Sequence, residues 1–241
     1  MSVDLVGAGP GDADLLTLRA ARLLGEADVI VHDRLIGPSV LALANPDADL
    51  IDVGKVPGIS TSQSTINDLP IALGRTGRRI VRLKGGNPFV FGRGGEEMIA
   101  LREAGIQCGV VPGVTSAGSA PLAAGIPVTH RGVARGVTVV TGQVVGDHDD
   151  YFRRIAHPEP SLVILMGVRN RRTIADQLMQ GGLIPTTPVA VIESARTNRQ
   201  RVTRGSLGEL GTLDIEAPTT IVIGPTAALS LLEIESAAAA L

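Results

Sequence analysis

Aromatic side chains and cysteines are scarce in this chain of 241 residues. Tryptophan is absent, and the aromatic residues are three phenylalanines and Tyr151. With so few rings and a net charge of −2, the chain offers neither the stacking platforms nor the basic field on which nucleic-acid binding depends. The single cysteine, Cys108, excludes an intrachain disulfide and any zinc site built from several cysteines. The four histidines show no paired ligand spacing, so no metal is expected.

Long apolar runs are missing as well. The apolar fraction is 44% and the mean hydropathy is +0.27, yet no run approaches the ~18 residues that a membrane span needs. The first residues, MSVDLVGAG, lack the basic region and following apolar stretch of a signal peptide. We therefore expect no membrane partner and a cytoplasmic location. The apolar residues are expected in parallel strands that are buried on both faces.

Short β-branched runs alternate with helical patterns along the whole chain. Strands are expected at residues 3–7, 28–33, 49–54, 78–86, 136–142, 161–167, 188–193 and 219–224. Helices are expected at residues 13–27, 38–44, 62–75, 95–105, 170–181 and 225–235, the first capped by Asp12 or Asp14. This alternation predicts an α/β protein with two domains and mostly parallel sheets. The Gly- and Pro-rich segment 110–132 places the boundary near Pro112–Gly113, giving domains 1–112 and 113–241.

The segment GAGPGD, residues 7–12, follows the first expected strand and precedes a helix. Its Gly7-x-Gly9-x-Gly11 spacing is similar to a dinucleotide-binding loop, but the final glycine is missing. Pro10 also removes a backbone donor where a pyrophosphate would need one. Two interpretations stay open: a tight turn between strand and helix, or a loop that approaches a ligand lacking a pyrophosphate.

The segment LKGGNPFVFGRGGEE, residues 83–97, is more specific. Gly85 and Gly86 follow a strand, at a position where a side chain would block the close approach of a ligand. A purely structural turn, with Phe89 and Phe91 filling the core, is the alternative. That alternative leaves the arginine between two glycine pairs, Arg93, unexplained.

Further polar residues follow other expected strands. Asp33 and Arg34 end one strand, Lys55 follows another, and Thr115-Ser116 stand at an expected helix start. Each has an ordinary interpretation as a helix cap or a solvated charge, and so does the His130-Arg131 pair in a loop. Their common position after strands favours one shared site. The arginine-rich segments 167–172 and 195–201 are interpreted as solvated surface.

Six segments of the chain together resemble the uroporphyrinogen-III C-methyltransferases, a branch of the tetrapyrrole methylases. They are LVGAGPGDADLLTLRA, VHDRLI, DVGK, LKGGNPFVFGRGGEE, VVPGVTSA and GIPVTHRG, in the order of that family. The resemblance implies two α/β domains with S-adenosylmethionine in the cleft between them, a homodimer, and no metal. It implies methylation of uroporphyrinogen III at C2 and C7 to give precorrin-2, which supplies sirohaem and cobalamin synthesis.

The resemblance also implies a role for individual residues. Asp33 would be the proton acceptor and Lys55 the proton donor. Arg93, Glu96 and Arg131 would face the substrate, whose eight carboxylates suit arginine, and Arg34 is a further candidate for this role. The implied contacts to the cofactor, whose product is S-adenosylhomocysteine, are Pro10, Gly85, Gly86, Asn87, Val90, Thr115, Ser116, Met166 and Ala195.

Two positions depart from the family pattern. Asn87 replaces the usual aspartate, which removes a negative charge near a cationic cofactor, so Asn87→Asp is predicted to bind S-adenosylmethionine more tightly. After Lys55 the family usually has an arginine and then a histidine, whereas this chain has Val56 and no histidine. The second departure concerns the substrate side of the site.

Alternative functions remain beside this one. The chain could methylate another tetrapyrrole, or it could hold S-adenosylmethionine without turnover. A nicotinamide oxidoreductase is a weaker alternative, because Pro10 and the missing glycine argue against a pyrophosphate. Asp33, Lys55, Arg93 and Glu96 are all present, which favours an enzyme over a degenerate binding module.

Overall fold

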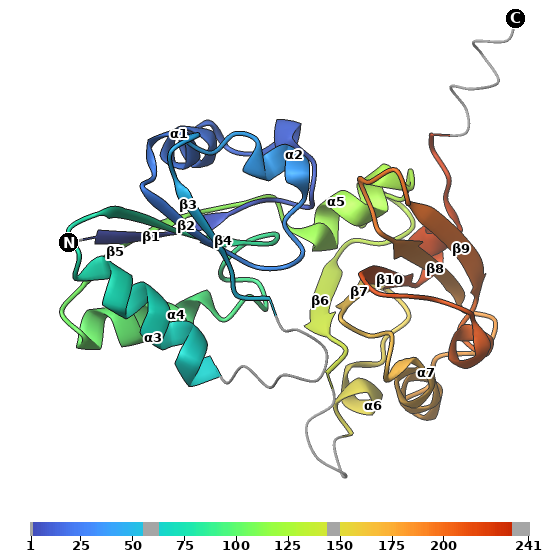
Figure 1. Cartoon of the computed structure of the whole chain (residues 1–241). Helices are drawn as coiled ribbons and strands as arrows, with labels where there is room; N and C mark the ends of the chain where they lie inside the picture. Colours follow the sequence, from blue (N-terminus) through green and yellow to red (C-terminus); the bar gives the residue numbers. More distant parts are fainter. Residues whose placement is uncertain (1, 55–62, 144–149, 233–241) are drawn as a thin grey trace, which may run out of the picture. The chain divides into compact units, whose positions relative to one another are not determined.

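The computed structural model describes residues 2–54, 63–143 and 150–232, with residues 63–67 described by their backbone alone. The chain divides into two compact units, Met1–Thr115 and Ser116–Leu241. Each unit contains one five-stranded sheet (Figure 1). The division falls within the Gly- and Pro-rich segment 110–132, in which the sequence places the boundary.

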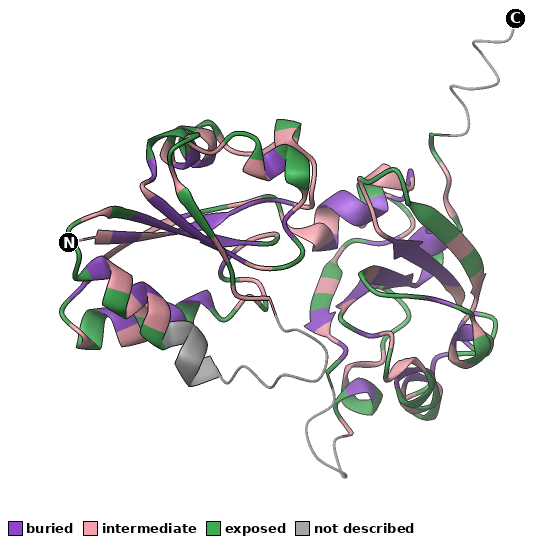
Figure 2. Cartoon of the chain, in the orientation of Figure 1, coloured by how far each residue is buried: buried purple, intermediate pink, exposed green. Residues whose placement is uncertain are grey.

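The sheet of the first unit is entirely parallel. Its strands are β1 (Ser2–Gly7), β2 (Val29–His32), β3 (Asp49–Asp52), β4 (Arg79–Lys84) and β5 (Gln107–Val111). They lie in the order β3-β2-β4-β1-β5. The sequence predicts β1 to β4, because their β-branched runs end in glycine or charged residues, whereas β5 was not among the expected strands. The central strands β1, β2 and β4 are largely buried, as Figure 2 shows.

Helices cover both faces of this sheet. The elements are η1 (Ala13–Leu15), α1 (Leu18–Glu26), α2 (Pro38–Leu41), α3 (Gln63–Gly74) and α4 (Gly94–Glu103). Figure 1 shows α1 and α2 on one face and α3 and α4 on the other. Val81 and Leu83 of β4 pack in the core under α1 and α2, whereas Ile80 packs with Leu101 of α4.

The single helix expected over residues 13–27 is divided in two. Asp12 caps η1, with its Oδ1 accepting from the Asp14 amide at 3.1 Å. Thr17 then caps α1, with its Oγ1 accepting from the Ala20 amide at 3.1 Å. The hydroxyl of Thr17 offers the backbone a new helix start, so the continuous-helix prediction is wrong at residues 16–17.

The sheet of the second unit is mixed. Its strands are β6 (Val137–Thr141), β7 (Ser161–Leu165), β8 (Pro188–Glu193), β9 (Arg201–Ser206) and β10 (Thr219–Ile223). They lie in the order β6-β7-β10-β8-β9, and the β6–β7 pair is parallel while the other three pairs are antiparallel. The predicted α/β class is confirmed, but in this unit the sheet is not mostly parallel, because β10 inserts antiparallel between β7 and β8.

The helical elements of the second unit also lie on two faces. They are α5 (Ser116–Ala123), α6 (Tyr151–Ile155), α7 (Arg171–Gln180), η2 (Leu210–Thr212) and η3 (Pro225–Ala228). One core joins α6, α7 and η2 to the sheet, and another joins α5 and η3 to it. Within the described ranges, neither unit has a helix long and apolar enough to cross a membrane.

Two expectations for the second unit need correction. The helix expected over residues 225–235 stops at Ala228, and the Leu231 amide instead donates to the Gly125 carbonyl at 2.9 Å. Strand β9 was not expected, because its sequence RVTRGS is polar and contains glycine. It lies at the edge of the sheet, where such residues are tolerated.

Candidate functional site

The two glycine loops of the first unit leave neighbouring strands. The chain passes from β1 to α1 on one face of the sheet, and from β4 to α4 on the other. Ligands of open parallel sheets bind beyond the carboxyl ends of the strands at such a reversal. Residues 8–12 and 85–93 therefore stand where the topology alone predicts a ligand.

Backbone contacts tie these loops together. The Gly9 amide donates to the Gly86 carbonyl at 3.2 Å, and the Gly86 amide donates to the Gly9 carbonyl at 2.7 Å. Both residues have a left-handed φ, near +69° and +66°. A Cβ on Gly113, in the loop after β5, would lie 2.2 Å from the Gly86 carbonyl oxygen. The left-handed backbone favours glycine at residues 9 and 86, and the packing of the chain requires it at residue 113.

Gly85 differs from these glycines. It is exposed, and a Cβ placed on it would meet only the Cβ of Leu35, at 3.9 Å. Nothing in the described chain therefore requires a glycine at residue 85. Its lack of a side chain leaves the backbone at the end of β4 open to a ligand.

Both polar atoms of the Asn87 side-chain amide form hydrogen bonds within the chain. Its Oδ1 accepts from the Phe89 amide at 2.9 Å, and its Nδ2 donates to the Gly113 carbonyl at 3.2 Å. The side chain thus fixes the turn that contains Pro88 and connects two loops of the site. The predicted contact of Asn87 with the cofactor remains a prediction.

Asp33, the predicted proton acceptor, directly follows β2. Its Oδ1 lies 2.5 Å from Nη2 of Arg82 on β4, the strand next to β2. The side chain of Asp33 is 34% exposed, whereas that of Arg82 is 3% exposed. An arginine thus holds one carboxylate oxygen while the group keeps access to solvent. Lys55 and Val56 lie outside the described residues.

Three further charged residues near Asp33 escaped the sequence analysis. Arg82, Lys84 and Glu97 are buried, and Glu97 lies in the first turn of α4. Nζ of Lys84 is 2.5 Å from Oε1 of Glu97, and Nε of Arg82 is 3.2 Å from its Oε2. The available signal was the alternation in RIVRLK, which places both cations on one face of a strand expected to be buried.

The apolar part of the second glycine loop is exposed. Phe89 and Phe91 are 58% and 42% exposed, so the alternative in which they fill the core is wrong. Arg93 precedes α4 and pairs with Glu96 at 3.9 Å, with both side chains more than half exposed. Such an exposed pair contributes little to stability. Val90 is half-buried between the two phenylalanines.

The predicted residues of the second unit follow strands as well. Met166 follows β7 and Ala195 lies just after β8. Both strands run antiparallel to β10, so their carboxyl ends lie on the same side of the sheet. Ser116 begins α5, directly after Thr115, as the sequence predicts. Arg131 is an exposed residue of a loop.

Left-handed backbone marks the same loops in both units. Among the described residues, five that are not glycine have a φ between +44° and +63°. They are Phe91, Arg93, Met166, Ser194 and Arg196. Each such residue costs about 1–3 kcal/mol, and this strain collects at functional sites. Arg93 and Met166 are themselves predicted site residues. Phe91 is next to the predicted residue Val90, and Ser194 and Arg196 flank the predicted residue Ala195.

The arginine-rich segment 195–201 is only partly solvated surface. Arg201 pairs with the buried Glu193, with Nε and Nη2 at 2.6 and 2.8 Å from its two carboxylate oxygens. Its bidentate geometry links β8 to the edge strand β9. Arg201 is half exposed, as the interpretation as solvated surface predicts, but its guanidinium is also held by a buried carboxylate.

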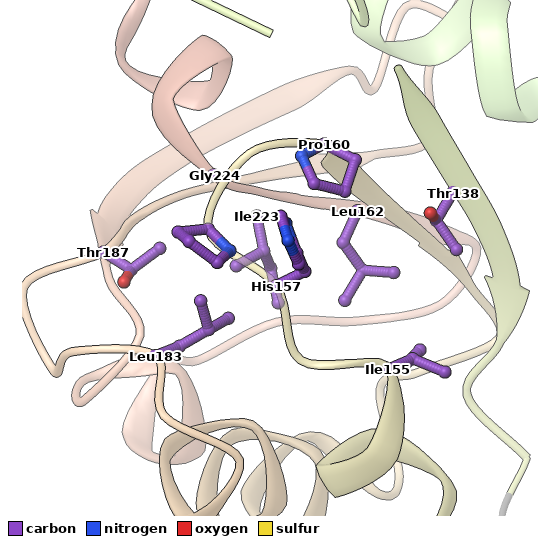
Figure 3. Close-up of a pocket in the computed structure, with 10 residues that line it drawn as sticks. Thr138, Ile155, His157, Pro160, Leu162, Leu183, Thr187, Ile223 and Gly224 are labelled. Atoms are coloured by element: carbon purple, nitrogen blue, oxygen red, sulfur yellow. The ribbon is translucent and has the colours of Figure 1, made fainter. Parts of the chain in front are cut away.

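A small cavity of the second unit is not a ligand site. It lies beside β7 and β10 and is lined in part by His157, Pro160, Leu162 and Thr187 (Figure 3). Its volume of about 10 Å³ leaves room for no more than about one water molecule. Neither a nucleoside nor a macrocycle fits into it.

Comparison with known proteins defines the class. Residues 2–211 match the family of Tetrapyrrole (Corrin/Porphyrin) Methylases, and the chain belongs to this family. It is 46% identical over 226 residues to a siroheme synthase of Psychromonas ingrahamii, covering 92% of this chain and 48% of the synthase. A siroheme synthase of Tolumonas auensis is 47% identical over 230 residues, covering 94% and 49%. The chain thus spans about half the length of these relatives.

Solved structures match over nearly their full length. A uroporphyrin III C-methyl transferase from Thermus thermophilus is 42% identical, with a TM-score of 0.82 over 94% of this chain and 93% of that one. The same enzyme complexed with S-adenyl homocysteine has a TM-score of 0.83, covering 95% and 94%. A cobalt precorrin-4 methyltransferase at 23% identity shares the fold, with a TM-score of 0.83. The fold and family predicted from the sequence are confirmed.

Proposed function

We propose that this chain transfers methyl groups from S-adenosylmethionine to C2 and C7 of uroporphyrinogen III and produces precorrin-2. One observation carries the proposal: the full-length match to the Thermus enzyme that holds S-adenosyl homocysteine, at 42% identity and a TM-score of 0.83. The half of the siroheme synthases that this chain matches would supply the same activity. Its product would serve sirohaem and cobalamin synthesis.

The residues of the first unit fit a cofactor of this kind. Gly85 leaves the end of β4 open, and the linked Gly9 and Gly86 loops present backbone groups at the reversal point of the sheet. Pro10, Asn87 and Val90 belong to the same loops. We infer that Thr115, Ser116, Met166 and Ala195 complete the site, in the interdomain cleft that the resemblance implies.

When bound, S-adenosylmethionine supplies a methyl group on a positively charged sulfur. The new bond to a pyrrole carbon forms as the methyl–sulfur bond breaks, and the electron pair of that bond stays on sulfur. The chain contributes mainly the alignment of the two reactants. No covalent intermediate with the protein is needed, in keeping with its single half-buried cysteine.

The methylated macrocycle must then lose a proton. Asp33 accepts it in this proposal, because its carboxylate is fixed by Arg82 on one side and accessible on the other. Lys55 acts as the proton donor. Arg93, Glu96 and Arg131 bind the polar groups of the substrate, and arginine suits its carboxylates. A homodimer and a cytoplasmic location complete the proposal.

The deciding experiment is incubation of the purified chain with S-adenosylmethionine and uroporphyrinogen III. We expect a product that is heavier by two CH2 units in mass spectrometry, because each added methyl group is accompanied by the loss of a proton, and that has the absorbance of precorrin-2. Asp33→Asn should fold and bind the cofactor but turn over slowly. A folded chain that yields no methylated macrocycle would contradict the proposed function.

Two alternative functions give different results in the same assay. A methylase of another tetrapyrrole would bind the cofactor and methylate a later corrin intermediate in place of uroporphyrinogen III. A binding module would show cofactor binding in calorimetry and no methylation of any tetrapyrrole. The accessible, cation-held Asp33 favours turnover over mere binding, because a binding module has no use for a proton acceptor.

A further inference from the structure

The guanidinium of Arg82 lies between two carboxylates, which come from different parts of the first unit. Its Nη2 is 2.5 Å from Oδ1 of Asp33 after β2, and its Nε is 3.2 Å from Oε2 of Glu97 on α4. Nη1 donates to the Leu83 carbonyl at 3.1 Å. The hydrogen bonds to Asp33, to the Leu83 carbonyl and from Nη2 to Oε1 of Glu97 at 3.4 Å hold the guanidinium in one orientation, with one edge toward Asp33.

The cluster continues to Lys84 on the same face of β4. Its Nζ is 2.5 Å from Oε1 of Glu97, so a row of alternating charges runs Asp33, Arg82, Glu97, Lys84. Two cations and two anions give a neutral set. Arg82, Glu97 and Lys84 have side chains only 3–4% exposed, while Asp33 alone keeps a third of its surface open.

Such a cluster is a poor device for stability. Removing charges from water costs free energy, and apolar residues of similar volume often stabilise a core as well or better. The neighbouring position on the same strand face, Ile80, shows that an aliphatic side chain packs there. The cluster ends at Asp33, which follows the carboxyl end of β2 and is partly exposed. This position indicates that the cluster acts on the Asp33 carboxylate.

We propose that Arg82 is a positioning residue for the proton acceptor Asp33, and that Glu97 and Lys84 hold Arg82 in place. This inference rests on the proposed function. Arg82 fixes one oxygen of the Asp33 carboxylate and balances its charge, so the other oxygen is presented to the macrocycle. The proton leaves the methylated macrocycle and forms an O–H bond on Asp33, while Arg82 itself neither gains nor loses a proton.

A double-mutant cycle on kcat tests this role. In the parent chain, Arg82→Met should lower kcat by about tenfold or more, within the range of acid–base catalysis, and leave the S-adenosylmethionine Kd within about threefold. In the Asp33→Asn background, the same substitution should lower kcat by less than about twofold, because the group that Arg82 positions is already gone. Arg82→Lys should retain more kcat than Arg82→Met, since it keeps the charge.

A matched control comes from the other end of β4. Arg79 pairs with Asp28 at 3.0 Å, and both are partly exposed and far along the strand from its carboxyl end. Arg79→Met should leave kcat unchanged. Thermal unfolding of every variant identifies any that do not fold.

If Arg82→Met does not fold, the paired variant Glu97→Gln with Lys84→Met replaces it in the cycle. This pair removes one charge of each sign, and it should lower kcat in the parent but not in the Asp33→Asn background. Multiplicative losses in the folded variants, or a folded Arg82→Met with parental kcat, would overturn the inference. A parent chain that does not methylate at all would instead contradict the proposed function.

Discussion

The amide nitrogen of Asn87 donates to the carbonyl of Gly113, 3.2 Å away and 26 residues further along the chain. The amide oxygen of the same side chain accepts from the Phe89 backbone at 2.9 Å. One side chain therefore fixes a turn with its acceptor and joins two loops with its donor. A carboxylate offers acceptors only and cannot do both.

Asn87→Asp should change cofactor binding and stability in opposite directions. We expect S-adenosylmethionine to bind up to about tenfold more tightly, because the added charge faces a cationic ligand. The free energy of unfolding should fall by about 1 kcal/mol, because the bond to Gly113 is lost. Calorimetry and urea denaturation at one ionic strength measure the two effects.

Asn87→Ala is the control for this substitution. It removes both hydrogen bonds and adds no charge, so it should destabilise the chain without tightening binding. Equal or weaker binding by Asn87→Asp would show that the site is adapted to an amide. Unchanged stability would show that the contact with Gly113 contributes nothing.

Gly85→Ala should separate binding from folding. A methyl group there meets only Leu35 at 3.9 Å, so the free energy of unfolding should stay within about 0.5 kcal/mol of the parent or rise slightly. Affinity for S-adenosylmethionine should fall by about tenfold, because the backbone loses its open face. Calorimetry measures the affinity and urea denaturation the stability.

Gly25→Ala is the matched control for Gly85→Ala. Gly25 is also exposed, and its added methyl would meet the Leu43 carbonyl oxygen at the same 3.9 Å. It lies near the end of α1, away from the carboxyl ends of the strands. Equal affinities of both variants and the parent would remove residue 85 from the cofactor site.

Glu193 should make stability depend on pH. Burial alone would raise the pKa of Glu193, but the hydrogen bonds from Arg201 and Glu216 and the charge of Arg201 together hold that pKa below its usual 4.5. A lowered folded-state pKa means stabilisation that is complete above 4.5 and is lost as the pH falls through the folded-state pKa. Glu193→Gln should therefore lower the melting temperature by several degrees at neutral pH.

The difference in melting temperature between the parent and Glu193→Gln should become smaller as the pH falls. Melting curves of the parent and Glu193→Gln should converge as the pH falls through the folded-state pKa of Glu193, which lies below 4.5, since protonation then removes the charge that the variant lacks. Asp176→Asn on the exposed side of α7 is the control. A difference that stays constant with pH would mean that the ion pair with Arg201 is not its origin.

Cys108 should be a slow nucleophile in the folded chain. Burial, with a smaller contribution from the Asp4 carboxylate, raises the pKa of this thiol from 9.0 to about 11. The thiolate fraction at pH 8 is then roughly a hundredfold lower than for an ordinary cysteine. Alkylation by iodoacetamide should slow by about that factor relative to the chain in urea. Equal rates in both conditions would contradict the burial of this group.

The glycine loops could be predicted from the sequence because their cause is local. Glycine pairs after a β-branched run mark the end of a strand, and parallel topology places such ends at one edge. The exposure of Phe89 and Phe91 was not predictable in this way. It depends on the loop after β4 turning outward at Asn87-Pro88, which leaves the rings away from the core.

The charged cluster around Arg82 depends on contacts between distant parts of the chain. The strand pattern gives the face of Arg82 and Lys84, but the position of Glu97 depends on how α4 packs on that face. Strand β10 is a similar case. Its residues form a strand in either direction, and only its insertion between β7 and β8 makes the second sheet mixed.

The left-handed backbone at Met166 and Arg93 sets a limit on how this chain can be made more heat-resistant. Glycine at either position would relieve a strain of about 1–3 kcal/mol, so selection for thermal tolerance alone would favour it. Each replacement would also delete a side chain from a loop that the proposed function places at the site. Improved variants are therefore to be sought elsewhere, and gains in stability at these positions would trade against turnover.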